Sequence, residues 1–337
     1  MKVAILSPIA WRTPPEHYGP WEQVASNITE GLVANNIDVT LFATGNAITA
    51  AKLAWCCQKP YADDKDADAK VNECLHISNL FERAAEFDII HNHFDFLPLS
   101  FSGLIKTPIV TTIHGFSSPL IVPVYKKYNS TTHYVAISNA NRHPDLDYAA
   151  TVYNGIDTTC FSFCEQPDDY LVYFGRIHPD KGAKEAIAIA AMAGKKLIIA
   201  GLIQDQHYFD QFIHPAIDDC NVVYAGNYNP TQRNALLGSA LALLHPISFD
   251  EPFGLSVVEA MCCGTPVIAF NRGSMPELIQ HNTTGFLVHT IEEAVAAVKN
   301  ITFINRKICR QHVMQHFSKE KMAADYIKVY KQILSGR

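Results

Sequence analysis

The sequence predicts an α/β protein with two doubly wound parallel sheets. Three observations point to this fold class. Short apolar runs alternate with stretches of helical periodicity, which is the pattern of strand–helix–strand units. The alternation occurs twice, once in each half of the chain. The 337 residues exceed one ordinary hydrophobic core, and 48% of them are hydrophobic, which is enough for two cores.

Buried strands and two helices are predicted in the first half of the chain. Helical periodicity predicts a helix over 23–35. Residues 60–70 form the most polar stretch, and we expect an exposed loop there that leads into a helix. The apolar runs that predict strands are Val3–Leu6, Asp38–Phe42, Asp88–His91, Ile109–Ile113 and Tyr134–Ile137.

The second half repeats the pattern, with helices expected over 184–193, 291–300 and about 318–334. We expect Rossmann-like domains over 1–160 and 161–317, with 318–337 as a helix that crosses back to the first domain. The predicted strands are Leu171–Phe174, Lys196–Ala200, Asn221–Tyr224, Leu241–Leu244 and Pro266–Ala269.

Composition excludes several classes of function. The net charge is −6, and residues 1–160 carry 11 Lys and Arg against 16 Asp and Glu, so the first half is the more acidic one. Neither half is basic, which argues against nucleic acid or anionic lipid as a main partner. No G-x-G-x-x-G occurs, as a nicotinamide or flavin enzyme would usually show after its first strand.

The sequence also indicates a cytoplasmic protein. Met1 and Lys2 lead into a four-residue apolar run, too short for a secretory signal core. No run approaches the roughly 20 apolar residues of a membrane span, so we expect no membrane association. The nine cysteines are an odd number and include no C-x-x-C pair, which is typical of a reduced protein without a zinc ribbon.

The stretch D-E-P-F-G-L-S-V-V-E, residues 250–259, is the most informative motif. Pro252 and Gly254 break the chain after Glu251, and helix-forming residues resume at Ser256. We expect a loop, then a helix whose first turn carries Glu259. A helix N-terminus presents unpaired N–H groups and partial positive charge, a ready phosphate site. Carboxylates before and inside this helix can accept hydrogen bonds from hydroxyls on either side of a phosphate.

This segment resembles the E-x7-E motif of retaining glycosyltransferases of family 4, which have the GT-B fold. The match continues through A-M-C-C-G-T-P-V-I-A-F-N-R-G-S-M-P-E-L-I, residues 260–279. Further fragments recur in the family's order: I-H-G at 113–115, N-G-I-D at 154–157 and F-G-R-I-H-P-D-K-G at 174–182. The resemblance covers nearly the whole chain and implies two Rossmann-like domains with a cleft between them.

The resemblance implies a diphosphate clamp at Arg176 and Lys181, after the turn at Gly175. Open α/β sheets bind ligands at the carboxyl ends of their strands, where these cations are expected. A guanidinium and an ammonium can neutralise a leaving diphosphate. The competing interpretation is surface pairing of these cations with Asp180 or Glu185.

The E-x7-E motif is implied to hold the sugar and the ribose of the donor. Glu251 would accept hydrogen bonds from hydroxyls of the donor sugar, and Glu259 from those of the ribose. Glu259 at a helix start would also favour the helix dipole. Backbone N–H groups toward the sugar or phosphate are expected from Phe253, Gly254, Leu255 and Ser256.

Three histidines of the first half are further candidates. The resemblance places His114 beside the donor sugar, and a structural histidine is the alternative. His91 and His93 look like a metal pair, with Asp95 as a third ligand only if the strand continues that far. GT-B enzymes generally need no catalytic metal, so we assign no metal site and favour acceptor binding or cleft shaping.

The loop 11–21, W-R-T-P-P-E-H-Y-G-P-W, is rich in proline and aromatic residues. The family usually has a glycine pair here, but Gly19 is followed by Pro20, which lacks an N–H. Only Gly19 is therefore carried over as a donor contact. Arg12, Glu16 and Tyr18 are candidate acceptor residues, with packing as the competing role.

The predicted function is a metal-independent, retaining glycosyltransferase without a cofactor. It would move a hexose from a UDP- or GDP-linked donor to a hydroxyl acceptor, for which the acidic first half favours a soluble sugar or oligosaccharide over a lipid. The alternatives are a GT-B nucleotide-sugar epimerase or sugar phosphorylase, or a non-catalytic nucleotide-sugar-binding module.

Overall fold

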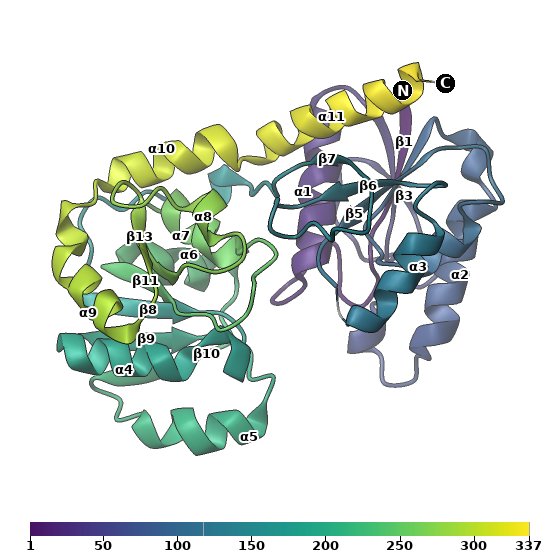
Figure 1. The fold of residues 1–337 in the computed structure, drawn as a ribbon. Coiled ribbons are helices and arrows are strands. Elements are labelled where there is room, and N and C mark those ends of the chain that lie inside the picture. The colour runs from purple at the N-terminus through teal and green to yellow at the C-terminus, as the bar shows by residue number, and fades with distance from the viewer. Residues whose placement is uncertain (117, 337) are drawn as a thin grey trace. The chain divides into compact units, whose positions relative to one another are not determined.

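A computed structural model describes residues 1–116 and 118–336 and confirms the α/β fold class. The chain divides into two compact units (Figure 1). The N-terminal unit comprises Met1–Gly155 together with the segment from Lys319 onward, and the C-terminal unit comprises Ile156–Ser318. Each unit contains one parallel sheet, as the double alternation of strands and helices predicts.

The N-terminal unit has a seven-stranded sheet in the order β3-β2-β1-β4-β5-β6-β7, with every pair parallel. Its helices are α1 (Pro20–Ala34), α2 (Ala69–Phe81), α3 (Val122–Lys127) and α11 (Lys319–Ser335). The strands are β1 (Lys2–Leu6), β2 (Asp38–Phe42), β3 (Lys52–Ala54), β4 (Ile89–Asn92), β5 (Ile109–Ile113), β6 (His133–Ala136) and β7 (Tyr148–Thr151).

All five strands predicted in this half are present, within a residue or so of the expected bounds. The two strands that the sequence did not predict are β3 and β7, which lie at the edges of the sheet. Edge strands are only partly buried here, so they lack the continuous apolar run of a central strand. Helix α1 begins at Pro20, earlier than the apolar period indicates, because proline is well suited to the first helical position.

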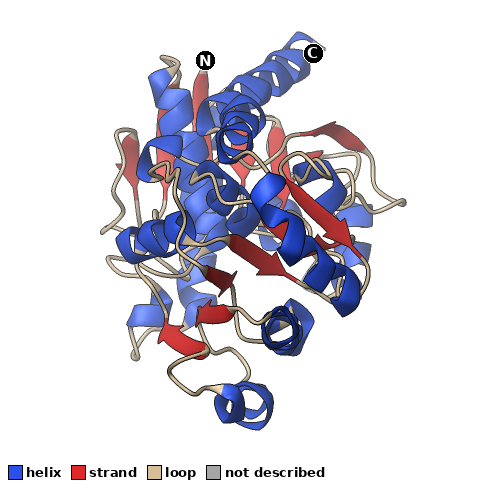
Figure 2. Ribbon diagram, turned by 90° about the vertical axis from the view of Figure 1, so that its left-hand side faces the viewer, coloured by secondary structure: helices blue, strands red, loops and turns tan. Residues whose placement is uncertain are grey.

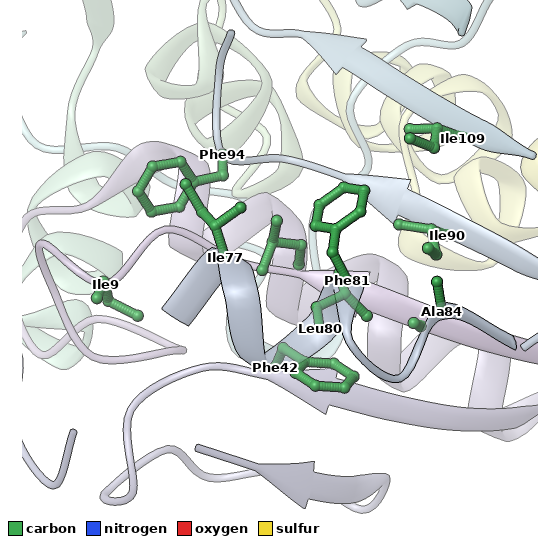
Figure 3. Packing of buried hydrophobic residues seen from close by; sticks show 11 residues of the cluster. Ile9, Phe42, Ile77, Leu80, Phe81, Ala84, Ile90, Phe94 and Ile109 are labelled. Atoms are coloured by element: carbon green, nitrogen blue, oxygen red, sulfur yellow. The ribbon is translucent and has the colours of Figure 1, made fainter. Parts of the chain in front are cut away.

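Apolar side chains fill the space between α2 and the central strands (Figure 3). Leu80 of α2 is completely buried and packs in one cluster with Phe42 of β2 and Ile90 of β4. Burial of side chains of this size stabilises a fold by about 1.5–3 kcal/mol each. This packing fixes β1 and β4, whose carboxyl ends lead into the candidate residues of this unit.

The final helix, α11, packs against α1 within the N-terminal unit (Figure 1). The contact is close at Gly31, where an added Cβ would lie 2.8 Å from Ala323 Cβ and 3.1 Å from the Lys319 carbonyl oxygen. Glycine therefore permits the two helix backbones to approach. Tyr326 and Tyr330 of α11 are also fully buried.

The C-terminal unit has a six-stranded parallel sheet in the order β10-β9-β8-β11-β12-β13, and strands and helices alternate along the chain. Figure 2 shows the helices of the protein in blue and its strands in red. The strands are β8 (Tyr170–Phe174), β9 (Lys196–Ala200), β10 (Val222–Gly226), β11 (Ala242–His245), β12 (Val267–Phe270) and β13 (Gly285–Val288). The helices are α4 (Ala183–Ala193), α5 (Gln206–Tyr208), α6 (Pro230–Ser239), α7 (Leu255–Cys262), α8 (Met275–Leu278), α9 (Ile291–Asn300) and α10 (Arg306–His316).

One expectation about the motif helix is wrong. Helix α7 begins at Leu255, and Glu259 lies beyond its first turn, which contains no acidic residue. The charge of Glu259 therefore interacts only weakly with the helix dipole, because that interaction is largely confined to the first turn. Among the described residues, no helix is long and apolar enough to span a membrane.

Candidate functional site

The C-terminal sheet changes winding direction between β8 and β11. From β8 the chain proceeds outward through β9 and β10, and from β11 it proceeds the other way through β12 and β13. In open parallel sheets, ligands bind at such a switch point, outside the carboxyl ends of the strands. The loops that follow β8 and β11 hold Arg176, Lys181 and Glu251, so these loops of the predicted motifs lie at the switch point.

Lys181 and Glu251 form the central ion pair of the site. Lys181 Nζ lies 2.5 Å from Glu251 Oε2, and only 13% and 14% of the two side chains are exposed. The Lys181 ammonium also lies 4.5 Å from the centroid of the Phe249 ring, a cation–π contact. Two groups that the sequence assigns to one ligand are thus brought together in the folded unit.

The competing surface pairings of the two cations are not formed. Arg176 hydrogen-bonds to Gln204 through Nη1, and Asp180 instead accepts from His178 Nδ1 at 2.5 Å. This contact lies at the start of the short turn Pro179–Lys181 before α4. Lys181 is consequently directed toward Glu251 and away from its sequence neighbours.

Glycines allow the two loops to approach closely. Gly182, with φ of 76°, is the N-cap residue before α4, and a Cβ there would lie 2.0 Å from the Pro246 carbonyl oxygen. The Ser248 backbone N–H donates to the Asp180 carbonyl at 2.9 Å across the same junction. Any side chain at position 182 would separate the loops that hold Lys181 and Glu251.

A third loop, which contains Gly273 and Ser274, packs against the backbone at Glu251. A Cβ at Gly273, whose φ is 53°, would lie 2.4 Å from the Glu251 backbone nitrogen. The Ser274 backbone N–H donates to the Glu251 carbonyl at 3.0 Å, and the Ser274 hydroxyl donates to the Phe253 carbonyl. The N-R-G-S fragment, residues 271–274, therefore positions the motif loop.

His245 belongs to this site and was not predicted from the sequence. It ends β11, is almost fully buried, and its Nε2 lies 3.8 Å from Glu251 Oε2. Burial, with a contribution from the Lys181 charge, lowers the pKa of His245 to about 3, so the imidazole is neutral. No sequence spacing links a histidine in a buried strand to this carboxylate, because the loop between them is irregular.

The second motif carboxylate, Glu259, is buried in α7. Its Oε1 lies 3.3 Å from Arg233 Nη1. Burial raises the pKa of Glu259, and the charge of Arg233 acts in the opposite direction. The helix is preceded by Gly254 with φ of 103°, and its first turn presents the backbone N–H groups of Leu255 and Ser256.

In the N-terminal unit, His114 follows β5 and contacts His93. His93 Nδ1 and His114 Nε2 are 3.0 Å apart, and the His114 ring stacks on Trp21 with centroids 5.4 Å apart. Burial lowers the pKa of His114 to about 3. Strand β4 ends at Asn92, and the His93 ring still lies beside that of His91, with centroids 4.1 Å apart.

His91 faces the final helix. Its Nδ1 is 2.6 Å from the Tyr330 hydroxyl, and its Nε2 is 2.7 Å from Thr112 Oγ1. Both ring nitrogens are thus occupied within the N-terminal unit, which favours a structural role. Within residues 1–116 and 118–336, no three His, Cys, Asp or Glu side chains are placed to hold a metal ion.

The loop before α1 brings its predicted residues close to one another. Arg12 Nη1 lies 2.9 Å from Glu16 Oε1, and the Tyr18 ring packs edge-on against Trp11. Gly19, with φ of 151°, directly precedes α1. A buried carboxyl at this junction, Glu22, was not predicted from the sequence, and it accepts the Trp11 backbone N–H at 3.2 Å.

Comparison with known proteins agrees with this architecture. A sucrose-phosphate synthase from Thermosynechococcus elongatus superimposes with a TM-score of 0.80 at 17% identity over the whole of both chains. A crystal structure of Anabaena HepE in complex with UDP-glucose gives 0.72 at 20% identity, also over both whole chains. These likenesses define the class of fold, GT-B.

Residues 21–159 match the family described as glycosyltransferase family 4, and residues 163–328 match glycosyl transferases group 1. The chain belongs to this family of glycosyltransferases. An uncharacterized 41.2 kDa protein in the cps region of Klebsiella pneumoniae is 33% identical over 168 residues. That match spans 48% of this chain and 46% of the Klebsiella protein, about half the length of each.

Proposed function

We propose that this protein is a retaining glycosyltransferase that moves a hexose from a nucleoside diphosphate sugar to a hydroxyl group of a soluble sugar or oligosaccharide. The observation that carries the proposal is the buried Lys181–Glu251 pair at the switch point of the C-terminal sheet. A cation and a carboxylate at adjacent strand ends match a ligand that joins a diphosphate to a polyhydroxylated sugar.

In the proposed reaction, Arg176 and Lys181 neutralise the charge that develops on the leaving diphosphate. Lys181 would divide its hydrogen bonds between Glu251 and the phosphate, since an ammonium has three donors. The acceptor hydroxyl then attacks from the face that the diphosphate leaves, and the departing phosphate takes its proton. Configuration is retained without a covalent enzyme intermediate, so Glu251 binds the sugar and is not a nucleophile.

Other predicted residues have binding roles in the proposal. Glu259 accepts from the ribose hydroxyls, and the backbone at Gly254, Leu255 and Ser256 donates to sugar or phosphate. From the N-terminal unit, His114 is proposed to contact the donor sugar. The donor is UDP- or GDP-linked, and the UDP-glucose complex of the structurally similar HepE supports UDP. The acidic first half supports a soluble acceptor.

A thermal-shift panel tests the donor proposal. UDP, GDP, ADP and their hexose conjugates are added with and without EDTA. A ligand at 100 times its Kd stabilises a protein by about 2.7 kcal/mol, which is a clear shift. We expect one of the UDP or GDP series to stabilise the protein equally in EDTA, because side chains neutralise the diphosphate. No shift with any of them contradicts the proposal, and a shift abolished by EDTA contradicts its metal-independent form.

Variants of the clamp test its role in binding and turnover. Arg176→Ala and Lys181→Met should each weaken diphosphate binding by about 1.5–3 kcal/mol, since each removes a charged hydrogen bond. Both should also abolish sugar transfer while leaving the unfolding transition in place. Lys195→Met is the matched control, because Lys195 also forms a 2.5 Å ion pair, with Asp169, but lies at the amino end of β9. Unchanged turnover in Lys181→Met would remove Lys181 from the mechanism.

A further inference from the structure

Glu259 is paired with a cation that none of the sequence motifs contains. Arg233 lies in α6, and its Nη1 is 3.3 Å from Glu259 Oε1. Only 18% of the Arg233 side chain and 6% of the Glu259 side chain are exposed. A carboxylate buried to this degree is strongly unfavourable unless it is paired. Arg233 therefore supplies a positive charge that favours the ionised form of Glu259 and opposes the effect of burial.

Aromatic rings fix the position of the Arg233 guanidinium. Its Cζ lies 5.8 Å from the centroid of the Phe161 ring and 6.0 Å from that of Phe174. Phe174 is the last residue of β8 and directly precedes Gly175 and the proposed clamp residue Arg176. Arg233 thus connects the buried carboxylate of α7 to the strand end where the proposed diphosphate-binding loop begins.

The protein does not use the full hydrogen-bonding capacity of this guanidinium. Arg233 Nε is buried and has no hydrogen-bond partner among the described residues. A guanidinium that served only to stabilise the fold would be expected to satisfy its buried donors. The contact between the two side chains joins Arg233 Nη1 to Glu259 Oε1 at 3.3 Å and does not involve Nε.

We propose that Arg233 is a positioning residue for nucleotide recognition: it holds Glu259 ionised and oriented so that the carboxylate accepts hydrogen bonds from the ribose diol of the donor. This inference rests on the proposed function, because it assumes a ribonucleotide ligand. Two adjacent hydroxyls donate best to an ionised carboxylate, since a protonated carboxyl has one oxygen converted to a donor. Substitution of Arg233 would remove the charge that favours the ionised Glu259 carboxylate, while Glu259 itself, the proposed contact with the ribose, stays in place.

The test compares a ribonucleotide with its 2′-deoxy form. Kd values are measured by calorimetry for UDP and 2′-deoxy-UDP, and for GDP and 2′-deoxy-GDP, on the wild-type protein and on Arg233→Met, Arg233→Lys and Arg142→Met. The wild-type protein should bind the ribonucleotide about 10-fold or more tightly than the deoxy form, which is typical of a hydrogen bond to a charged group. Arg233→Met should bind both forms similarly, and Arg233→Lys should recover part of the preference.

The outcomes separate this inference from the proposed function. Arg142, which lies over the Tyr148 ring in the N-terminal unit, is the matched control and its variant should keep the full preference. If Arg233→Met binds more weakly but keeps the wild-type ratio of Kd values, the pair is only structural and the inference is overturned. If the wild-type protein binds a ribonucleotide without preferring it to the deoxy form, the inference fails and the donor site stands. If it binds neither UDP nor GDP, both fail.

Discussion

The environment of one residue, Glu22, makes the stability of the folded protein depend on pH. It lies in the first turn of α1, is 3% exposed, and accepts the Trp11 backbone N–H. Burial raises the pKa of this carboxyl to about 7. A carboxyl with a raised pKa stabilises the folded state at low pH, where it is protonated, and this stability is lost as the pH rises from about 4.5 through about 7.

Glu22→Gln should therefore remove this pH dependence. A shift of this size corresponds to at most about 3 kcal/mol. Between pH 4.5 and 8, the free energy of unfolding of the variant should rise relative to wild type, as measured by urea denaturation. Glu86→Gln is a control for which the stability difference from wild type should change with pH in the opposite direction, because a hydrogen bond from Arg83 lowers the pKa of the exposed Glu86. A wild-type-to-variant difference for Glu22→Gln that stays constant with pH would contradict the prediction.

Only some of the charged and polar residues of the candidate site could be predicted from the sequence. Arg176, Lys181 and Glu251 could be chosen because they lie in loops with recognisable turn and motif patterns. His245 and Arg233 could not, because one ends a buried strand and the other lies within a helix of ordinary composition. Their contacts with Glu251 and Glu259 arise only when β11, α6 and α7 pack together.

At the scale of elements, the crossing of α1 and α11 depends on one small residue. An added Cβ at Gly31 would meet Ala323 Cβ at 2.8 Å and the Lys319 carbonyl oxygen at 3.1 Å. Gly31→Ala improves intrinsic helix propensity by about 1 kcal/mol, but overpacking between two helices typically costs about 1–3 kcal/mol. We expect net destabilisation because one of the two contacts is with backbone, which cannot rotate away.

Thermal unfolding followed by tryptophan fluorescence checks this prediction, since Trp11, Trp21 and Trp55 all belong to the N-terminal unit. Gly103→Ala is the matched control, because a Cβ there meets nothing within 4 Å. Adding Ala323→Gly to Gly31→Ala should restore part of the lost stability by removing the side-chain contact. A Gly31→Ala variant as stable as Gly103→Ala would show that the helices separate without cost.

At the scale of the whole molecule, the last helix is tied into the first sheet by a polar network. The Tyr330 hydroxyl contacts His91 Nδ1 at 2.6 Å, joining residues 239 positions apart. Thr112 Oγ1 contacts both His91 Nε2 and the Tyr326 hydroxyl. Burial lowers the pKa of His91 well below its usual value, so these contacts involve a neutral ring.

Tyr330→Phe should destabilise the N-terminal unit. It removes the partner of a fully buried ring nitrogen, which typically costs about 1–3 kcal/mol. Urea denaturation followed by tryptophan fluorescence should show a lower midpoint with an unchanged slope. Tyr128→Phe, at a half-buried position after α3, is the control and should change the midpoint less. Equal midpoints for the two variants would show that water replaces the Tyr330 hydroxyl at His91.

The sequence by itself determined the fold class, the central strands and the loops of the candidate site. These features are local: a buried strand needs a continuous apolar run, and the loop after β8 or β11 needs glycine, proline and charged residues at fixed positions. The edge strands β3, β7 and β13 escaped prediction because partial burial leaves no such run.

Only the tertiary structure decided which charged and polar groups meet. The order of strands in the C-terminal sheet places the end of β8 beside the end of β11, and this brings Lys181 to Glu251. Packing of α6 near α7 brings Arg233 to Glu259, and the return of α11 brings Tyr330 to His91. Such contacts depend on sheet order and helix packing, which no local spacing encodes, and for this reason the partners of the predicted site residues emerged from the fold alone.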